Sequence, residues 1–97
     1  MQAMKNKLTN LVIQVPYKRA GNVIYQQDVN FDVYKNEDQY SLVPLLPPDE
    51  LEIANLPPSL DFILQDGKPV SLRGKRDGNL HVIEDAVAIL RERAMLV

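Results

Sequence analysis

The segment Glu84–Leu96, EDAVAILRERAML, has the clearest helical period in the chain. At about 100° per residue, it and the residue before it form one apolar stripe, made of Ile83, Ala86, Val87, Leu90 and Ala94. Val82, Ile89 and Leu96 widen this stripe to about half of the circumference, and Arg93 interrupts it. Acidic residues open the segment and arginines close it, as the helix dipole favours. The pattern predicts an amphipathic C-terminal helix against which the preceding strands pack.

Three runs before the central prolines alternate apolar and polar residues and predict strands at 8–17, 23–34 and 40–46. Polar turns at 18–22 and 35–39 separate them. Pro16 and Pro44 have no N–H to give to a ladder, so each of these two strands should end at its proline or lie at a sheet edge. The second run is long for a strand, which favours a bend or a bulge.

The second half of the chain is punctuated by prolines and by two Asp-Gly pairs. The two Pro-Pro pairs bracket a short helix expected over about 49–55. Asp66-Gly67 and Asp77-Gly78 lie between runs of strand character and predict hairpin turns, which makes a three-stranded meander over 60–83 the favoured interpretation. The alternative is a helix that begins near Leu80, capped by Asp77 or Asn79.

Together these elements predict an α+β fold. We expect a mostly antiparallel sheet of about five or six strands, with the C-terminal helix packed on one face and a short helix in the proline-rich crossing. The 97 residues predict one domain over 1–97, in which residues 1–7 could lack fixed structure. The expected core contains Leu11, Ile13, Val15, Tyr25, Val29, Phe31, Val33, Leu42, Phe62, Leu64, Leu72, Ile83, Val87 and Leu90.

Composition makes several chemistries improbable. The chain has no cysteine, which excludes disulfides, thiolate metal sites and cysteine nucleophiles. His81 is the single histidine, and with Glu84 and Asp85 it offers too few ligands for a metal site, so no metal and no cofactor are expected. No apolar run reaches the length of a signal peptide or a membrane span, and we expect a cytoplasmic protein without a membrane partner.

Catalytic motifs are also missing from the sequence. A polar row on one face of the second strand, formed by Gln26, Asp28, Asn30 and Asp32, is typical of the solvent face of a half-buried sheet. No nucleophile elbow, zinc-protease motif or phosphate-binding loop is present. We therefore predict that the protein is not an enzyme.

The net charge of −2 is unevenly distributed along the chain. Arg73, Lys75 and Arg76 fall in a turn with two glycines, and Lys18 and Arg19 fall in another turn. Cations beside backbone N–H groups suit a phosphate, so nucleic-acid or phosphoanion binding through these basic turns is the alternative function. The pI of about 5.3 and the few aromatics beside these cations favour solvated hairpin tips instead.

The favoured interpretation is a small interaction module that associates with itself and whose protein partner is unknown. The apolar arc of the final helix is wider than one sheet face covers, which leaves Val82, Ile89, Leu96 and Val97 as candidates for a helix-mediated homodimer interface. The competing hypothesis is a strongly curved sheet that wraps the helix and buries both of its flanks within one chain.

Overall fold

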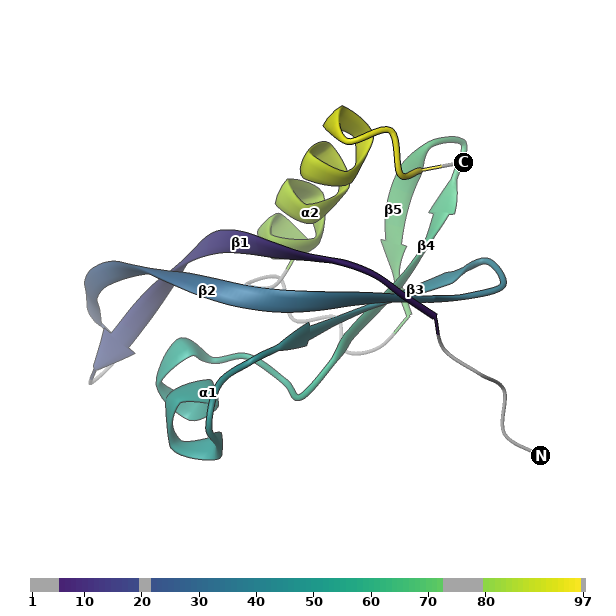
Figure 1. Cartoon of the computed structure of the whole chain (residues 1–97). Helices are drawn as coiled ribbons and strands as arrows, with labels where there is room; N and C mark the ends of the chain where they lie inside the picture. Colours follow the sequence, from purple (N-terminus) through teal and green to yellow (C-terminus); the bar gives the residue numbers. More distant parts are fainter. Residues whose placement is uncertain (1–5, 20–21, 73–79, 97) are drawn as a thin grey trace.

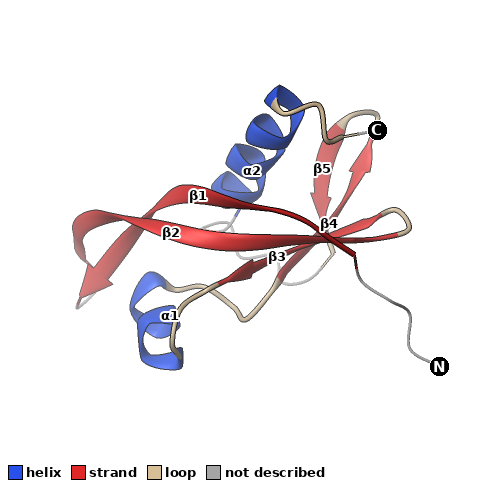
Figure 2. Cartoon of the chain, viewed as in Figure 1, coloured by secondary structure: helices blue, strands red, loops and turns tan. Residues whose placement is uncertain are grey.

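The computed structural model describes residues 6–19, 22–72 and 80–96, and for residues 18, 19 and 22–24 it describes the backbone only. The elements run in the order β1 (Asn6–Arg19), β2 (Asn22–Asn36), β3 (Gln39–Pro44), α1 (Pro48–Ala54), β4 (Leu60–Gln65), β5 (Lys68–Ser71) and α2 (Leu80–Glu92) (Figure 1). The strands make one antiparallel sheet in which each pairs with its neighbour in sequence, from β1 at one edge to β5 at the other (Figure 2). The chain is therefore a compact α+β domain, as predicted.

β1 and β2 form a long hairpin whose inner face carries the apolar residues of both strands. Leu11 lies opposite Phe31 and Ile13 lies opposite Val29, and all four side chains are buried. Both strands run beyond the predicted limits, because polar residues continue the ladder outside the apolar alternation. Asn6 already pairs with Lys35, so the strand begins inside the first seven residues, for which the sequence had left a lack of fixed structure open.

The two strand prolines act in the two ways that the sequence left open. Pro16 lies within β1, which is an edge strand of the sheet. Pro44 ends β3, a central strand: it pairs with Phe31 of β2, whereas the ladder between β3 and β4 already stops at Leu42. Neither proline therefore removes a donor that the sheet uses.

The first Asp-Gly pair makes the predicted hairpin between β4 and β5. Asp66 and Gly67 have φ of 54° and 79°, the two consecutive positive values of a type I′ turn, and Gln65 pairs with Lys68 directly across it. The second pair, Asp77-Gly78, lies outside the described residues.

The strand favoured over residues 79–83 is wrong, because α2 begins at Leu80. Adjacent residues of a strand point to opposite faces, but Val82 and Ile83 are both buried, with 0% and 1% of their surface exposed. On a helix these two residues share one face with Ala86 and Val87, which are also buried. Glu84 and Asp85 had been expected in the first turn of the helix. Because the helix begins at Leu80, they lie after that turn.

The end of α2 also differs from the prediction of a helix through Leu96. The helix ends at Glu92, Ala94 takes a φ of 55°, and the Met95 N–H donates to the Leu90 carbonyl at 2.9 Å. This closing turn sends Met95 and Leu96 back onto the core, where both are partly buried.

α2 contacts β1 and β5, which are the two outermost strands of the sheet. One helix can touch both edges only if the sheet curves around it, and Figure 1 shows α2 between these two strands. α1 packs on β1 nearer the β1–β2 turn, where the Tyr17 hydroxyl donates to Glu50 Oε1 at 3.3 Å. Both helices contribute to a single core.

Most of the predicted core residues are buried, and three are not fully so. Tyr25 and Leu72 are about half exposed, at 48% and 45%, and Leu64 is partly buried. Tyr25 lies on the outer part of the long hairpin, and Leu72 follows the end of β5. The prediction omitted several residues that are buried: Tyr17, Tyr40, Ala54, Leu56, Leu60, Val82 and Ala86.

Candidate functional site

The structure does not describe the side chains of the residues in the two basic turns. Arg73, Lys75 and Arg76 lie outside the described residues. Lys18 and Arg19 form the last two positions of β1, where they pair with Val23 and Asn22, and only their backbone is described. The hypothesis of an anion site at 73–76 and 18–19 therefore remains a prediction from sequence.

The polar row of β2 lies on the outer face of the sheet, away from the core. Asp32 Oδ1 accepts a hydrogen bond from Asn10 Nδ2 at 3.1 Å and forms an ion pair with Lys7 Nζ at 3.2 Å. The hydrogen bond from Asn10, and then the Lys7 ammonium, hold the pKa of Asp32 below its usual range. A general acid needs the opposite shift, so this carboxylate is suited to tying β1 to β2.

The described part of the chain contains neither a cluster of metal ligands nor a helix of membrane-spanning length. Within residues 6–19, 22–72 and 80–96, no group of three histidine, aspartate or glutamate side chains is placed to hold a metal ion, and His81 is exposed. No helix in these same ranges is long and apolar enough to cross a membrane.

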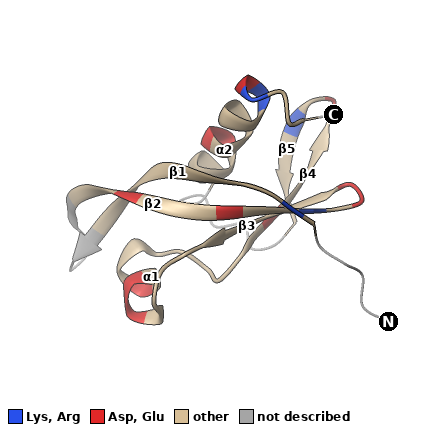
Figure 3. Ribbon diagram, in the orientation of Figure 1, with Lys and Arg blue, Asp and Glu red and all other residues tan. Residues whose placement is uncertain are grey.

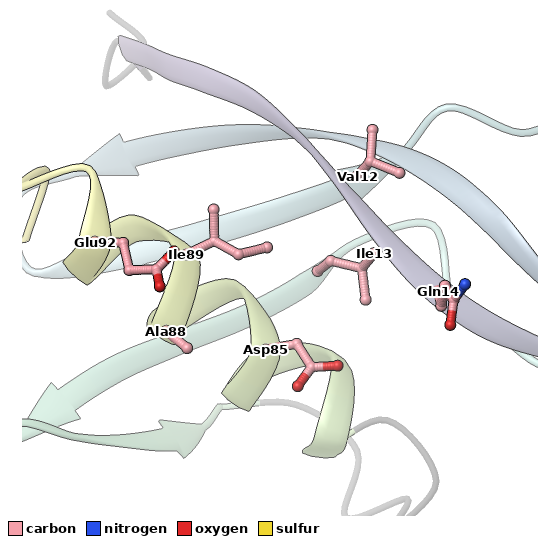
Figure 4. Close-up of a pocket in the computed structure, with 7 residues that line it drawn as sticks. All are labelled: Val12, Ile13, Gln14, Asp85, Ala88, Ile89 and Glu92. Atoms are coloured by element: carbon pink, nitrogen blue, oxygen red, sulfur yellow. The ribbon is translucent and has the colours of Figure 1, made fainter.

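A groove of about 310 Å³ lies between β1 and α2 (Figure 4). Val12, Ile13 and Gln14 line it from the strand, and Asp85, Ala88, Ile89 and Glu92 line it from the helix. The packing explains the lining: Ile13 points inward to the core, Ile89 is partly buried against that core, and Ala88 is too small to fill the space beside them. The groove thus has an apolar centre, with Gln14 on its strand side and two carboxylates on its helical side.

The free edge of β1 runs beside this groove. Arg93 Nη1 donates to the Asn10 carbonyl at 3.0 Å and to Thr9 Oγ1 at 3.1 Å, which shows that the Asn10 backbone faces away from β2. In an antiparallel pair, the residues whose N–H and C=O point outward alternate with those bonded to the partner, and the β1–β2 register is regular between Thr9 and Tyr17. Val12, Gln14 and Pro16 therefore also present their backbone to the edge.

This assignment agrees with the position of Pro16, because a proline is tolerated where no ladder donor is required. The unpaired stretch is bounded on one side by the Arg93 contact at Asn10 and on the other by Pro16. Between them, Val12 and Gln14 have backbone N–H and C=O groups that no described part of the chain pairs. We call this segment and the adjoining groove the β1 edge site.

Two acids frame the β1 edge site on α2. Asp85 and Glu92 are seven residues apart, about two helical turns, so they lie on one face of the helix about 10 Å apart along its axis. Both are exposed, and neither takes part in an ion pair or side-chain hydrogen bond of the described part of the chain. Figure 3 shows acidic positions on α2, on α1 and along β2.

The residues predicted for a helix-mediated dimer are largely used within the chain. Val82 is fully buried, so it is not available to a second copy and this part of the prediction is wrong. Ile89 and Leu96 are partly buried and pack against the core, and Val97 lies outside the described residues. The curved sheet contacts α2 from both edges, and Ile89 stays partly exposed where it lines the groove beside β1.

Sequence reasoning did not identify the β1 edge site, although three signals pointed to it. Pro16 marked an edge strand, Val12 broke the polar face of the strand, and Arg93 broke the apolar arc of the helix. Val12 is 47% exposed and Arg93 binds the edge backbone, so each break in pattern belongs to the site. Their proximity could not be inferred, because it depends on the curvature that brings α2 to β1.

Comparison with protein-family models, with curated proteins and with solved structures found no match.

Proposed function

We propose that this protein is a non-enzymatic protein-interaction module that binds an extended polypeptide segment by adding it as a strand to the edge of β1. The observation that carries the proposal is the backbone of Val12 and Gln14, which no described part of the chain pairs, beside a groove with an apolar centre. An added strand gains main-chain hydrogen bonds from the edge, while the groove receives alternate side chains of the segment.

The ends of the site support a short, defined segment. Arg93 occupies the Asn10 carbonyl, and Pro16 offers no donor, so ladder hydrogen bonds are available mainly at Val12 and Gln14. Open edges commonly carry such blocks against uncontrolled pairing. Here the blocks leave a gap in which the edge is flanked by exposed Val12 and by the groove, as a strand-binding site requires.

Selection from a library of random peptides, each long enough for one strand of about six to ten residues, tests the proposal. Peptides selected on the immobilised chain should lose binding to Gln14→Pro, which removes one outward N–H and leaves the β1–β2 ladder intact. Gln14→Ala removes the side chain alone and should keep binding. A chain that selects no peptide, or peptides that bind Gln14→Pro as well as the native protein, would refute the site.

A homodimer is the second candidate, and the same edge supports it. Two copies related by a two-fold axis near Ile13 would place Val12 of one β1 opposite Gln14 of the other, which joins the two sheets without using the buried flank of α2. Light scattering at micromolar concentration should then give twice the chain mass of 11.0 kDa for the native protein and the single mass for Gln14→Pro. A single mass for the native chain excludes this candidate.

Binding of nucleic acid or another phosphoanion by the basic turns is kept as the sequence-based alternative. Mobility-shift assays at low and moderate salt test it, since replacement of Arg73, Lys75 and Arg76 by alanine should abolish any salt-sensitive binding.

A further inference from the structure

Resting on the proposed function, we propose that the segment received by the β1 edge site belongs to another protein and carries basic side chains at two positions, one for Asp85 and one for Glu92. The inference comes from the charge of the helical wall. Two exposed carboxylates, unpaired within the described part of the chain, flank a strip formed by Ala88 and Ile89. Figure 4 shows Asp85 at the end of the groove nearer Gln14 and Glu92 at the other end.

The direction of the added side chains follows from strand pairing. Directly opposite residues of paired strands point to the same face, so alternate residues of an added strand continue the inner face of the sheet, where α2 lies. The central inward residue would then cover Ala88 and Ile89, which favours an apolar side chain. The outward residues would lie beside Val12 and Gln14, which are exposed to solvent.

The spacing of the two acids sets the spacing of the cations. Their separation along α2 is about 10 Å, and inward positions four residues apart on a strand are about 13 Å apart. A lysine or arginine on its flexible stem spans the remaining difference. The expected recognition sequence is thus basic, any, apolar, any, basic, in an extended conformation.

A second copy of this chain fits the helical wall less well. Two-fold pairing through β1 would set a second α2 beside the first, and it would bring the same two carboxylates to a site that already holds two. Like charges brought together without counter-charges oppose association. The charge of the wall therefore favours a basic strand from a different protein.

The experiment uses fluorescein-labelled peptides built on Lys-Thr-Ile-Thr-Lys, on the same peptide with both lysines replaced by glutamine, and on the same peptide with both replaced by glutamate. Fluorescence anisotropy with the full chain measures the three affinities. Exposed ion pairs contribute modestly, so the lysine peptide should bind about fivefold more tightly than the glutamine peptide at low salt. The advantage should shrink as salt rises, and the glutamate peptide should bind most weakly.

Variants locate the effect on the protein. The double variant Asp85→Asn, Glu92→Gln should bind the lysine and glutamine peptides equally, with unchanged affinity for the glutamine peptide. Glu84→Gln is the matched control, because it removes one exposed α2 charge that does not line the groove, and it should preserve the preference. Gln14→Pro should lower the affinity of the chain for all three peptides.

The outcomes separate this inference from the proposed function. Equal binding of the three peptides by the native chain, with loss in Gln14→Pro, overturns the basic partner and keeps strand addition. A lysine preference that survives in the double variant also overturns the assignment to Asp85 and Glu92. Absence of binding by every peptide, together with an unproductive library selection, overturns both.

Discussion

Tyr17 links α1 to the sheet through its hydroxyl. Its ring is buried, and burial raises its pKa above the ordinary value of 10.0, with the charge and hydrogen bond of Glu50 acting in the same direction. The folded chain therefore holds this proton more tightly than the unfolded chain does. The resulting stability is fully present below about pH 10 and is lost as the pH rises through the folded-state pKa.

Replacing Tyr17 with phenylalanine should lower the free energy of unfolding by about 1 kcal/mol at neutral pH, because the hydrogen bond to Glu50 is lost. The variant should also lose less stability than the native chain between about pH 9 and pH 11. Urea unfolding across this range measures both effects. Tyr25→Phe is the control: Tyr25 is half exposed and lies 5.4 Å from the Tyr17 ring centre to centre, and its replacement should change little. Equal alkaline losses in all three proteins would contradict the account.

The pKa of Asp32 is shifted in the opposite direction to that of Tyr17. Its pKa is lowered in the folded chain, so its contribution is present above about pH 4 and disappears as the pH falls through the folded-state value. Asp32→Asn should therefore flatten the acid loss of stability between about pH 5 and pH 2. Asp28→Asn, which removes an exposed carboxylate from the same face, is the charge-matched control. Urea unfolding at several pH values decides, and identical profiles for the two variants would show that the Lys7–Asp32–Asn10 contacts are not stabilising in solution.

At the scale of single residues, sequence predicted burial best where the alternation was regular. Leu11, Ile13 and Val15 are buried because β1 keeps one register from Thr9 to Tyr17. Tyr25 shares the parity of Val29 yet is exposed, because alternation reports the face of a strand and not whether another element covers it. The pairing of Arg93 with Asn10 joins distant parts of the chain, so the break that Arg93 makes in the apolar arc could not by itself identify Asn10 as its partner.

The β4–β5 hairpin depends on a turn that requires positive φ at two successive residues. Gly67, with φ of 79°, meets this requirement without strain, and a Cβ there would have space, with Arg91 Nη2 at 4.0 Å as its nearest neighbour. Gly67→Ala should therefore lower the free energy of unfolding by about 1 kcal/mol through backbone strain alone.

Asp66→Asn is the matched substitution, because asparagine accepts the φ of 54° at this position and should leave stability within about 0.5 kcal/mol of the native value. Thermal or urea unfolding of the two variants measures the difference. A neutral Gly67→Ala would show that the turn does not adopt the I′ conformation in solution.

At the scale of elements, α1 and the first Asp-Gly hairpin follow directly from local chemistry, and both were predicted within a residue or two. The start of α2 at Leu80 was given only by the alternative interpretation, since the favoured one placed a strand there. The sequence of residues 79–83 alternates well enough for a strand. The helical conformation is favoured because it buries one common face, made of Val82, Ile83, Ala86 and Val87. Tertiary burial decides such short segments, since propensity alone distinguishes them weakly.

The whole molecule is organised by the curvature of the sheet, which brings both edge strands to α2. This arrangement makes Val82 an internal contact. Val82→Ala should lower the free energy of unfolding by about 2 kcal/mol, whereas Leu80→Ala, on the same helix but 43% exposed, should lower it by less than about 1 kcal/mol. Urea unfolding at two protein concentrations measures the pair. Equal losses, or a Val82 effect that depends on concentration, would instead place Val82 at an interface between copies.

The fold class was predictable because strand alternation and helical period are local properties of the sequence. The β1 edge site was not predictable, because it exists only after the sheet has curved far enough for Ile89 and Ala88 to approach Ile13. The basic turns were visible in the sequence for the opposite reason, since adjacent cations need no fold to be noticed. Local patterns thus gave the architecture, and the contacts of the folded chain gave the candidate site.

Amide hydrogen exchange at single-residue resolution tests the free edge of β1 most directly, first on the chain alone and then with the lysine peptide. In the free chain, the Val12 and Gln14 amides should exchange fast, and the Leu11, Ile13 and Val15 amides should be protected by β2. Peptide binding should slow exchange at Val12 and Gln14 specifically. Protection of these two amides in the free chain, or an unchanged rate at both when the peptide is bound, would contradict strand addition at this edge.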